Sequence, residues 1–411
     1  MRFVFVHQNC PGQYLHYIRE LLRRNRHEVF FITGANANEI PGLRKLSYLP
    51  SMGSTPGIQI NAVEFESAMI RAQAAYGMAV KLSDLGMRPD VVIGHNGWGE
   101  MLHIADVWPD VPRIGYFEFF YHTHGLDVDF DPEFPMATEA RARIRVKNAV
   151  NLLGLEACTV GQTPTEFQRS TYPAWARDKI RLIPEGAPMD ACHPDTTAVF
   201  RLPGTRRSWQ TSGPRRLVTF VARNLEPYRG VHIMLRALPA LLAARPDLDV
   251  VMVGGDGVSY GALPPGGGSW KDVFLAELGD RVDTGRVFFP GQIEYRDYVK
   301  LLQVSAAHVY LTYPFVASWS LREAMATGCA IVASDTAPVR EFIIHGENGL
   351  LVPFLEPGAL VGAILAVLGD PKLSNRLRNG ALAYAKAKLD GAYHISAMDS
   401  LVREITGQEP K

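Results

Sequence analysis

The sequence has no excess of charge of either sign, because 42 lysine and arginine residues balance 42 aspartate and glutamate residues. A general nucleic-acid-binding protein usually carries a clear basic excess, with which it neutralises phosphates. The balance therefore predicts that nucleic acid is not a partner. It leaves room for a local basic pocket that binds a phosphate.

Cysteines and long apolar runs are also scarce. The 4 cysteines are scattered, with no CxxC or metal-ligand spacing, which favours free thiols in a reducing, cytoplasmic compartment. No stretch approaches the roughly 18 consecutive apolar residues of a membrane span. The start, MRFVFVHQN, turns polar too early for a signal peptide. We expect no transmembrane segment, and peripheral membrane contact stays open.

Short apolar runs alternate with helical stretches, and the pattern occurs twice. Such alternation predicts parallel sheets built from strand–helix–strand units, so the fold class is α/β with two doubly wound, Rossmann-like sheets and a cleft between them. Segment 201–216, which contains Pro, Gly, Ser, Thr and Arg, is predicted to be a linker or an exposed loop. The expected strands are 1–6, 27–33, 90–94 and 112–117 in the first half, and 216–222, 248–253, 287–289, 307–311 and 330–334 in the second.

Ligands of doubly wound sheets bind beyond the carboxyl ends of the strands, so the loops there are the candidates. In loop 6–13, Gly12 lets the backbone approach an anion, although an ordinary loop explains the same residues equally well. In loop 222–230, Arg223 and Arg229 suit the two charges of a diphosphate, and the alternative is a solvated arginine pair on a surface loop. Gly255 follows another strand and is a weaker signal, because Gly-Gly-Asp is also common in turns.

The stretch 310–352 carries the most information. Ser318 and Ser320 come just before a predicted helix that contains Glu323. The free N–H groups at such a helix start can hold a phosphate, and a carboxylate in the first turn can accept two hydrogen bonds from a ribose diol. The alternative is that Glu323 is only a favourable charge at the start of the helix.

Polar residues also follow two neighbouring strands of the first half. The candidates for an acceptor site are His95 after the strand 90–94, and Glu118, His122 and His124 after the strand 112–117. Structural roles explain these residues about equally well. Asp127 and Asp129 form a DxD pair, but the pair does not follow a strand and lies among aromatic residues. We therefore predict no metal there and favour a loop that covers the acceptor pocket.

The ordered motifs resemble the GT4-type retaining glycosyltransferases of GT-B fold. HQNCPGQ (7–13) is similar to the family's loop after the first strand, and IPEGAP (183–188) to its turn at the domain junction. RNLEPYRG (223–230) resembles its phosphate loop. REAMATGCAIVAS (322–334) and HGENGLLV (345–352) resemble its nucleotide-side segments. The order of these segments is far more specific than any one glycine motif.

The resemblance implies domains and roles. It assigns 1–195 to the acceptor side and 196–384 to the nucleotide-sugar, with a helix at about 385–411 that crosses back. It places Arg223 on the diphosphate and Glu323 on the donor ribose as the second glutamate of the family's E-x7-E motif. The first glutamate is replaced by Phe315, and Arg229 stands where a lysine is usual. The donor-side candidates are Gly12, Arg223, Arg229, Gly255, Ser318, Trp319, Ser320, Leu321 and Glu323. The catalytic candidates are His95, Glu118, His122 and Arg223.

The predicted function is transfer of a sugar from a nucleoside-diphosphate sugar to an acceptor hydroxyl, with retention of anomeric configuration, without a metal and without any further cofactor. The acceptor is left open among glycan, lipid, small molecule and protein. The alternatives are a nucleotide-sugar epimerase of the same fold and a nucleotide-sugar-binding protein without transferase activity, the latter motivated by Phe315.

Overall fold

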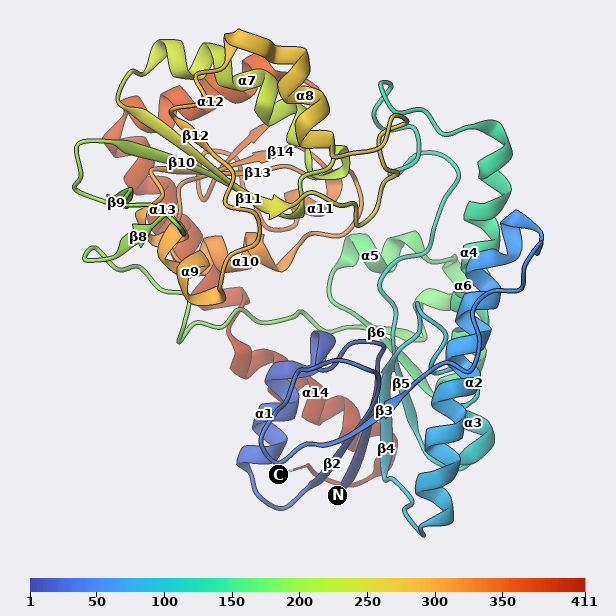
Figure 1. Cartoon of the computed structure of the whole chain (residues 1–411). Helices are drawn as coiled ribbons and strands as arrows, with labels where there is room; N and C mark the ends of the chain where they lie inside the picture. Colours follow the sequence, from blue (N-terminus) through green and yellow to red (C-terminus); the bar gives the residue numbers. More distant parts are fainter. Residues whose placement is uncertain (411) are drawn as a thin grey trace. The chain divides into compact units, whose positions relative to one another are not determined.

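The computed structural model describes residues 1–410 and divides them into two compact units. Unit 1 consists of Met1–Glu185 together with the chain from Gly391 onward, and unit 2 is Gly186–Asp390. Figure 1 shows both units, with the two ends of the chain close to the first sheet. The sequence placed the two boundaries at 195/196 and at about 384/385.

Unit 1 is built on a seven-stranded sheet of order β3-β2-β1-β4-β5-β6-β7, and every neighbouring pair is parallel. Its central strands are buried on both faces, which is why they read as continuous apolar runs. The strands are β1 (Arg2–Val6), β2 (Glu28–Gly34), β3 (Arg44–Tyr48), β4 (Val91–His95), β5 (Arg113–Tyr116), β6 (Val160–Thr163) and β7 (Ile180–Leu182).

Helices cover both faces of this sheet. One core contains side chains of α1 (Leu15–Arg23) and α14 (Gly391–Thr406), and the other contains side chains of α2 (Val63–Asp84) and α3 (Ile104–Val107). The sheet is therefore doubly wound, as predicted. The remaining α-helices of unit 1 are α4 (Arg141–Ala157), α5 (Glu166–Thr171) and α6 (Ala174–Arg177).

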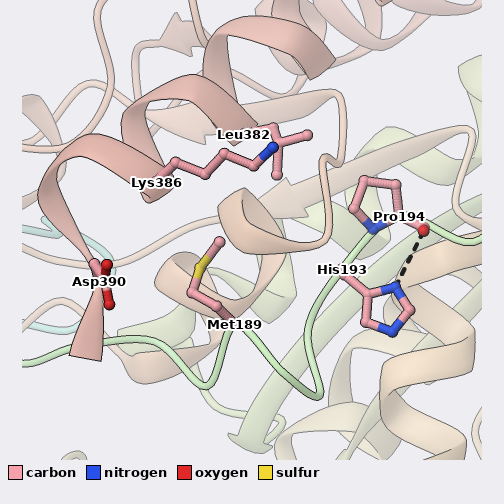
Figure 2. Close-up of a pocket in the computed structure, with 6 residues that line it drawn as sticks. All are labelled: Met189, His193, Pro194, Leu382, Lys386 and Asp390. Carbon is pink, nitrogen blue, oxygen red and sulfur yellow. Dashed lines mark hydrogen bonds between the residues drawn. The ribbon is translucent and has the colours of Figure 1, made fainter. Parts of the chain in front are cut away.

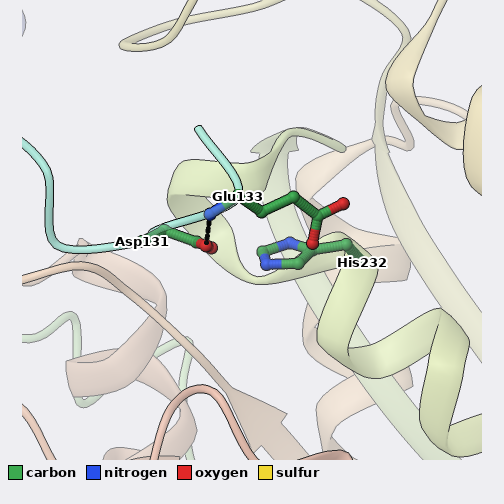
Figure 3. Close-up of side chains that lie close together, drawn as sticks. All are labelled: Asp131, Glu133 and His232. Carbon is green, nitrogen blue, oxygen red and sulfur yellow. Dashed lines mark hydrogen bonds between the residues drawn. The ribbon is translucent and has the colours of Figure 1, made fainter. Parts of the chain in front are cut away.

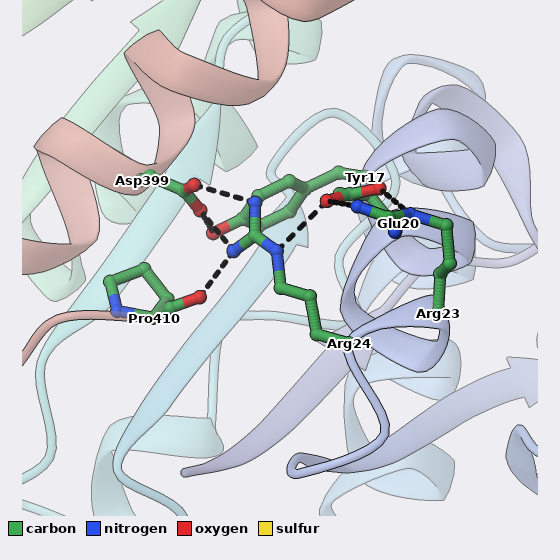
Figure 4. A network of polar contacts seen from close by, with 6 residues as sticks. All are labelled: Tyr17, Glu20, Arg23, Arg24, Asp399 and Pro410. Atoms are coloured by element: carbon green, nitrogen blue, oxygen red, sulfur yellow. Dashed lines mark hydrogen bonds and ion pairs between the residues drawn. The ribbon is translucent and has the colours of Figure 1, made fainter.

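The C-terminal helix α14 is fixed to α1 by a polar network (Figure 4). Asp399 accepts hydrogen bonds from the Tyr17 hydroxyl at 2.9 Å and from Arg24 at 2.7 Å. Arg24 also bonds to Glu20 on its own helix and to the backbone carbonyl of Pro410. This network ties the last helix to the first sheet.

Unit 2 contains a six-stranded parallel sheet of order β12-β11-β10-β13-β14-β15. Its strands are β10 (Arg216–Asn224), β11 (Leu248–Gly255), β12 (Val287–Phe288), β13 (Ala307–Tyr310), β14 (Ile331–Ser334) and β15 (Leu350–Val352). Its helices are α7 (Val231–Ala244), α8 (Trp270–Leu278), α9 (Tyr295–Val304), α10 (Trp319–Ala326), α11 (Ala337–Arg340), α12 (Pro357–Gly369) and α13 (Pro371–Lys388).

The prediction of a linker or exposed loop at 201–216 holds for its exposure, since most of these residues are exposed and lie in turns, but it missed a short hairpin. The antiparallel strands β8 (Val199–Arg201) and β9 (Ser208–Gln210) form a hairpin there. Trp209 is buried, and its indole N–H donates to Asp249 at 2.8 Å. Phe200 and Leu202 are buried in the same core as Trp209, so a few apolar residues anchor a segment whose composition is otherwise that of a loop.

Many further elements carry no prediction from the sequence. They include α2, whose buried stripe consists mainly of alanines, and the strands β3, β6 and β7. β3 lies at the edge of the sheet and is largely polar. Within residues 1–410, no helix is both long enough and apolar enough to cross a membrane.

We predict that Asp399→Ala destabilises unit 1 by about 2 kcal/mol, because hydrogen bonds to a charged group contribute about 1.5–3 kcal/mol. The measurement is the urea-unfolding transition followed by circular dichroism. Glu404→Ala on the same helix is the matched control. It removes an exposed ion pair to Arg181, and such pairs contribute less than about 1 kcal/mol. Equal effects of the two substitutions would contradict the anchoring role of Asp399.

Candidate functional site

In unit 1, histidines meet at the carboxyl ends of neighbouring strands. β1 and β4 are paired with Val6 opposite Gly94, so the residues that follow, His7 and His95, lie side by side. Their ring centroids are 5.2 Å apart, and the rings are nearly perpendicular. The His95 ring also lies 5.8 Å from that of Trp98. The site is therefore built on strand ends, where the sheet fixes its position.

Backbone amides determine which nitrogen of each ring can accept. The amide of Asn9 donates to Nδ1 of His7 at 2.8 Å, and that of Gly97 donates to Nδ1 of His95 at 2.9 Å. In the neutral rings the proton therefore sits on Nε2. Nε2 of His95 is 3.6 Å from a carboxylate oxygen of Glu118, which is partly exposed. The structure thus brings together two of the predicted catalytic residues, His95 and Glu118.

His7 is held neutral by its surroundings. Burial lowers the pKa of its imidazole to about 3, and the neighbouring His95 acts in the same direction. Gly12 packs against the face of this ring: a Cβ at that position would come within 3.0 Å of the ring atoms, and its φ is +54°. Gly12 is therefore required for close packing against His7. Its predicted role toward an anion stays a prediction.

The other residues expected on the acceptor side have different contacts. Nε2 of His122 lies 2.7 Å from the backbone carbonyl of Thr171, and Nδ1 of His124 lies 3.2 Å from Arg141. Asp129 of the DxD pair also bonds to Arg141 and accepts from the Met136 amide. These contacts tie the segment to itself and to α4 and α5.

The same segment continues with a tight turn at Asp131. Its carboxylate accepts a hydrogen bond from the Glu133 backbone amide at 3.0 Å (Figure 3). A side chain that accepts from the amide two residues later is ordinary Asx-turn chemistry. The turn accounts for the local geometry after the DxD pair.

In unit 2, the loop after β10 places a buried cation, Arg229, at the carboxyl ends of the strands. Arg229 donates to the Thr312 hydroxyl at 2.7 Å and to the Val316 carbonyl at 3.1 Å. Its guanidinium lies 4.9 Å from the ring centroid of Tyr260. Gly230 turns the chain with φ +73°. Among the described residues, no carboxylate forms an ion pair with Arg229, although the buried Glu226 carboxylate acts on it electrostatically. Arg223, by contrast, is exposed.

Helix α10 begins next to this arginine. Ser318 is the N-cap and accepts from the Ser320 amide, while its own amide donates to the Tyr310 hydroxyl at 2.6 Å. Trp319 is partly exposed, whereas Leu321 is fully buried in the core. The Leu321 side chain is therefore part of the packing. Its predicted role toward the donor can involve only its backbone.

Glu323 lies on α10, and two tyrosines of α9 hold its carboxylate. The Tyr295 hydroxyl donates to Oε1 and the Tyr298 hydroxyl to Oε2, both at 2.9 Å. Burial raises the pKa of the Glu323 carboxyl, and the two hydroxyls oppose that rise. The prediction that places Glu323 in the first turn of the helix is wrong, because α10 has no acidic residue in its first turn. The alternative, in which Glu323 is only a favourable charge at the helix start, therefore fails as well.

Position 315 is part of an aromatic group. The Phe315 ring lies 5.1 Å from Tyr260 and 5.8 Å from Tyr228, and it is buried. Gly255, at the end of β11, lies beside Asn224: a Cβ there would be 2.5 Å from the Asn224 side-chain oxygen. At position 315, a buried aromatic side chain thus occupies the place where the resemblance leads us to expect an acid.

Sequence reasoning missed three of these residues. His7 lies inside a loop that was selected for its glycine, and Tyr295 and Tyr298 lie in a helix with no motif. The signal for His7 was its position directly after the first strand. For the two tyrosines there was none, because their pairing with Glu323 exists only through the packing of α9 on α10.

A surface cavity of about 370 Å³ lies elsewhere in unit 2 (Figure 2). None of the predicted site residues lines it. Its lining residues are Met189, His193, Pro194, Leu382, Lys386 and Asp390.

Comparison with solved structures defines the fold class. Sucrose-phosphate synthase from Thermosynechococcus elongatus superimposes with a TM-score of 0.71 at 18% identity, covering 99% of both chains. HepE from Anabaena, in complex with UDP and glucose, gives a TM-score of 0.68 at 16% identity, covering 98% of this chain and 100% of that one. At these identities the likeness shows the fold, which is GT-B.

Two sequence families match the chain. Residues 25–192 match the "Glycosyl transferase family 4 group", and residues 205–383 match "Glycosyl transferases group 1". A phosphatidyl-myo-inositol mannosyltransferase from Mycolicibacterium smegmatis is 32% identical over 179 residues, which is 42% of this chain and 40% of that protein. The chain thus spans less than half the length of that relative. Its N-terminal and C-terminal parts are thus each similar to a domain family of glycosyl transferases.

We predict that the His7 imidazole stays neutral from pH 8 down to pH 5, because its pKa in the folded chain is about 3. Since the unfolded value is about 6.5, the unfolded state takes up a proton below that pH that the folded state does not, so the free energy of unfolding decreases as pH falls from about 6.5 toward 3. Nitrogen NMR of labelled protein, with His7→Gln to assign the signal, measures this. Titration of the His7 signal near pH 6.5 would contradict the prediction.

Proposed function

We propose that the chain is a retaining glycosyltransferase that moves a sugar from a nucleoside-diphosphate sugar to an acceptor hydroxyl, without a metal. The observation that carries the proposal is Arg229, a buried cation that forms no ion pair among residues 1–410, next to the start of α10. The buried Glu226 carboxylate acts on it electrostatically but accepts its own hydrogen bonds from backbone amides. Burying a charge without an ion-paired counter-ion is costly, and an anionic ligand at this place offsets that cost.

Departure of the sugar leaves charge on the β-phosphate. Arg229 and the positive end of the α10 dipole stabilise that charge, and such preorganised stabilisation is usually the largest catalytic contribution. Because the charge is met by a guanidinium and a helix dipole, the reaction needs no divalent cation. Arg223 is exposed at the end of β10 and reaches the phosphates as the ligand binds.

Glu323 binds the ribose of the donor. Each carboxylate oxygen accepts one tyrosine hydroxyl and keeps a second lone pair, so both oxygens can still accept from a diol. An ionised carboxylate that accepts two hydroxyls gives short, strong hydrogen bonds.

His95 and Glu118 serve the acceptor hydroxyl. Nε2 of His95 is a donor and Glu118 is an acceptor 3.6 Å from it, so together they can orient a hydroxyl and accept its proton as it attacks. The structure supports no covalent nucleophile among the described residues. The acceptor class stays open among glycans, lipids, small molecules and proteins, and we place the reaction in the cytoplasm.

The comparisons support the transferase rather than the alternatives. Both matching families are described as glycosyl transferases, and the mycobacterial relative is a mannosyltransferase. HepE was solved with UDP and glucose, which supports a nucleotide-sugar as the donor. The epimerase expected as an alternative is not favoured.

The activity is tested by incubating the protein with UDP-, GDP- and ADP-sugars and measuring release of the nucleoside diphosphate. We expect release with one base, accelerated when an acceptor is supplied. Epimerised donor without nucleotide release would show an epimerase instead. Tight nucleotide binding without turnover of any donor would show a binding protein.

Arg229→Gln is expected to lower kcat about 100- to 1,000-fold, as the loss of one preorganised donor to a developing charge does. Arg340→Gln is the matched control, because it removes an exposed ion pair to Asp335 in the same unit. Arg223→Ala tests the second arginine in the same assay. Unchanged turnover by either Arg229→Gln or Arg223→Ala would remove that residue from the phosphate role.

A further inference from the structure

The carboxylate of Glu323 lies at the centre of a buried network in unit 2. Both of its oxygens accept from tyrosines of one helix, at positions three residues apart on α9. Residues spaced by three lie on the same face of a helix, so one helix presents both hydroxyls to one carboxylate. Beyond them, the Cys192 sulfur lies 3.4 Å from the Tyr295 hydroxyl.

The two tyrosines differ in their surroundings. Tyr298 is 8% exposed and belongs to the core of unit 2, whereas Tyr295 is 47% exposed. Glu323 itself is 9% exposed. A carboxylate in such a place has to be hydrogen-bonded to remain ionised, and the tyrosines provide those bonds. Tyr298 fixes one oxygen from the core side, and Tyr295 fixes the other at the surface.

We propose that Tyr295 and Tyr298 are positioning residues that hold Glu323 so that it distinguishes a ribose from a 2′-deoxyribose. The inference rests on the proposed role of Glu323 in binding the donor ribose. With one lone pair of each oxygen occupied by a tyrosine, the remaining pairs have a fixed direction. Two adjacent hydroxyls match that arrangement, and a sugar that lacks one of them leaves an acceptor unpaired.

This arrangement also sets the ionisation of the carboxylate. Burial raises the pKa of Glu323, the hydroxyls of Tyr298 and Tyr295 lower it, and the nearby Arg322 guanidinium lowers it as well. The Cys192 sulfur contacts the Tyr295 hydroxyl and is the thiol that lies beside this network. Removal of a tyrosine hydroxyl therefore raises the pKa of Glu323 further, and the carboxyl takes up a proton at a higher pH.

The test is isothermal titration of the whole chain with UDP, GDP and ADP and with their 2′-deoxy counterparts. We expect the wild type to bind the ribose form of its nucleotide about tenfold more tightly, since one hydrogen bond to a charged group increases affinity by about tenfold or more. Tyr295→Phe, Tyr298→Phe and the double variant are each expected to reduce the preference about threefold or more. The ratio of the affinities for the ribose and 2′-deoxyribose forms is informative because both forms carry the same phosphates, so the effect of phosphate titration cancels.

Two further readouts separate positioning from simple destabilisation. Tyr384→Phe is the control, because it removes a tyrosine hydroxyl that bonds to the Glu341 backbone carbonyl at 2.8 Å in the same unit. As the pH is lowered, Tyr295→Phe is expected to lose the ribose preference at a higher pH than the wild type does, because Glu323 of the variant takes up its proton at a higher pH. A variant that only weakens the fold lowers the affinity for both nucleotide forms equally.

The outcomes distinguish this inference from the proposed function. Absence of nucleotide binding, or a ribose preference unchanged in Glu323→Ala, overturns the ribose role of Glu323 and the positioning role with it. A preference lost in Glu323→Ala but retained in the tyrosine variants, at the level of Tyr384→Phe, overturns the positioning role alone. Loss in Glu323→Ala and in the tyrosine variants, with Tyr384→Phe unchanged, supports both.

Discussion

Burial of ionisable side chains at the carboxyl ends of parallel strands is the constraint on which the rest of the structure depends. His7 follows β1, and Arg229 follows β10 on the loop that leads into α7. Both are buried where a sheet edge meets the loops above it. A buried polar group has to find hydrogen-bond partners, so each loop is shaped to bring partners to it.

The two units meet this constraint with different chemistry. In unit 1, backbone amides donate to the histidine rings and leave them as neutral donors. In unit 2, a hydroxyl and a carbonyl accept from Arg229, and two tyrosine hydroxyls donate to Glu323, which favours the charged form of both groups. Unit 1 therefore offers a weakly charged surface suited to hydroxyls. Unit 2 offers fixed charges suited to a phosphate and a ribose.

Sequence reasoning identified the elements whose signal is local. The buried strands, the doubly wound arrangement and the start of α10 all follow from apolar runs and capping residues. It failed where the signal is not local. The hairpin at β8 and β9 is held by Trp209, which bonds to Asp249, and by apolar neighbours in the same core, and the hydroxyls that hold Glu323 come from another helix. His122 was grouped with His95 by chain proximity, but its ring bonds instead to the backbone at Thr171.

The division of the chain has a consequence for biosynthesis. Unit 2 is one uninterrupted segment, and its two ends are joined where the Ala187 amide donates to the Leu389 carbonyl at 2.8 Å. It is thus an insertion into unit 1, and a ribosome completes it before the residues of α14 emerge. Since domains generally fold as units, unit 2 can fold during translation, whereas unit 1 must wait for α14. The first part of the chain to be made is therefore the last to be completed.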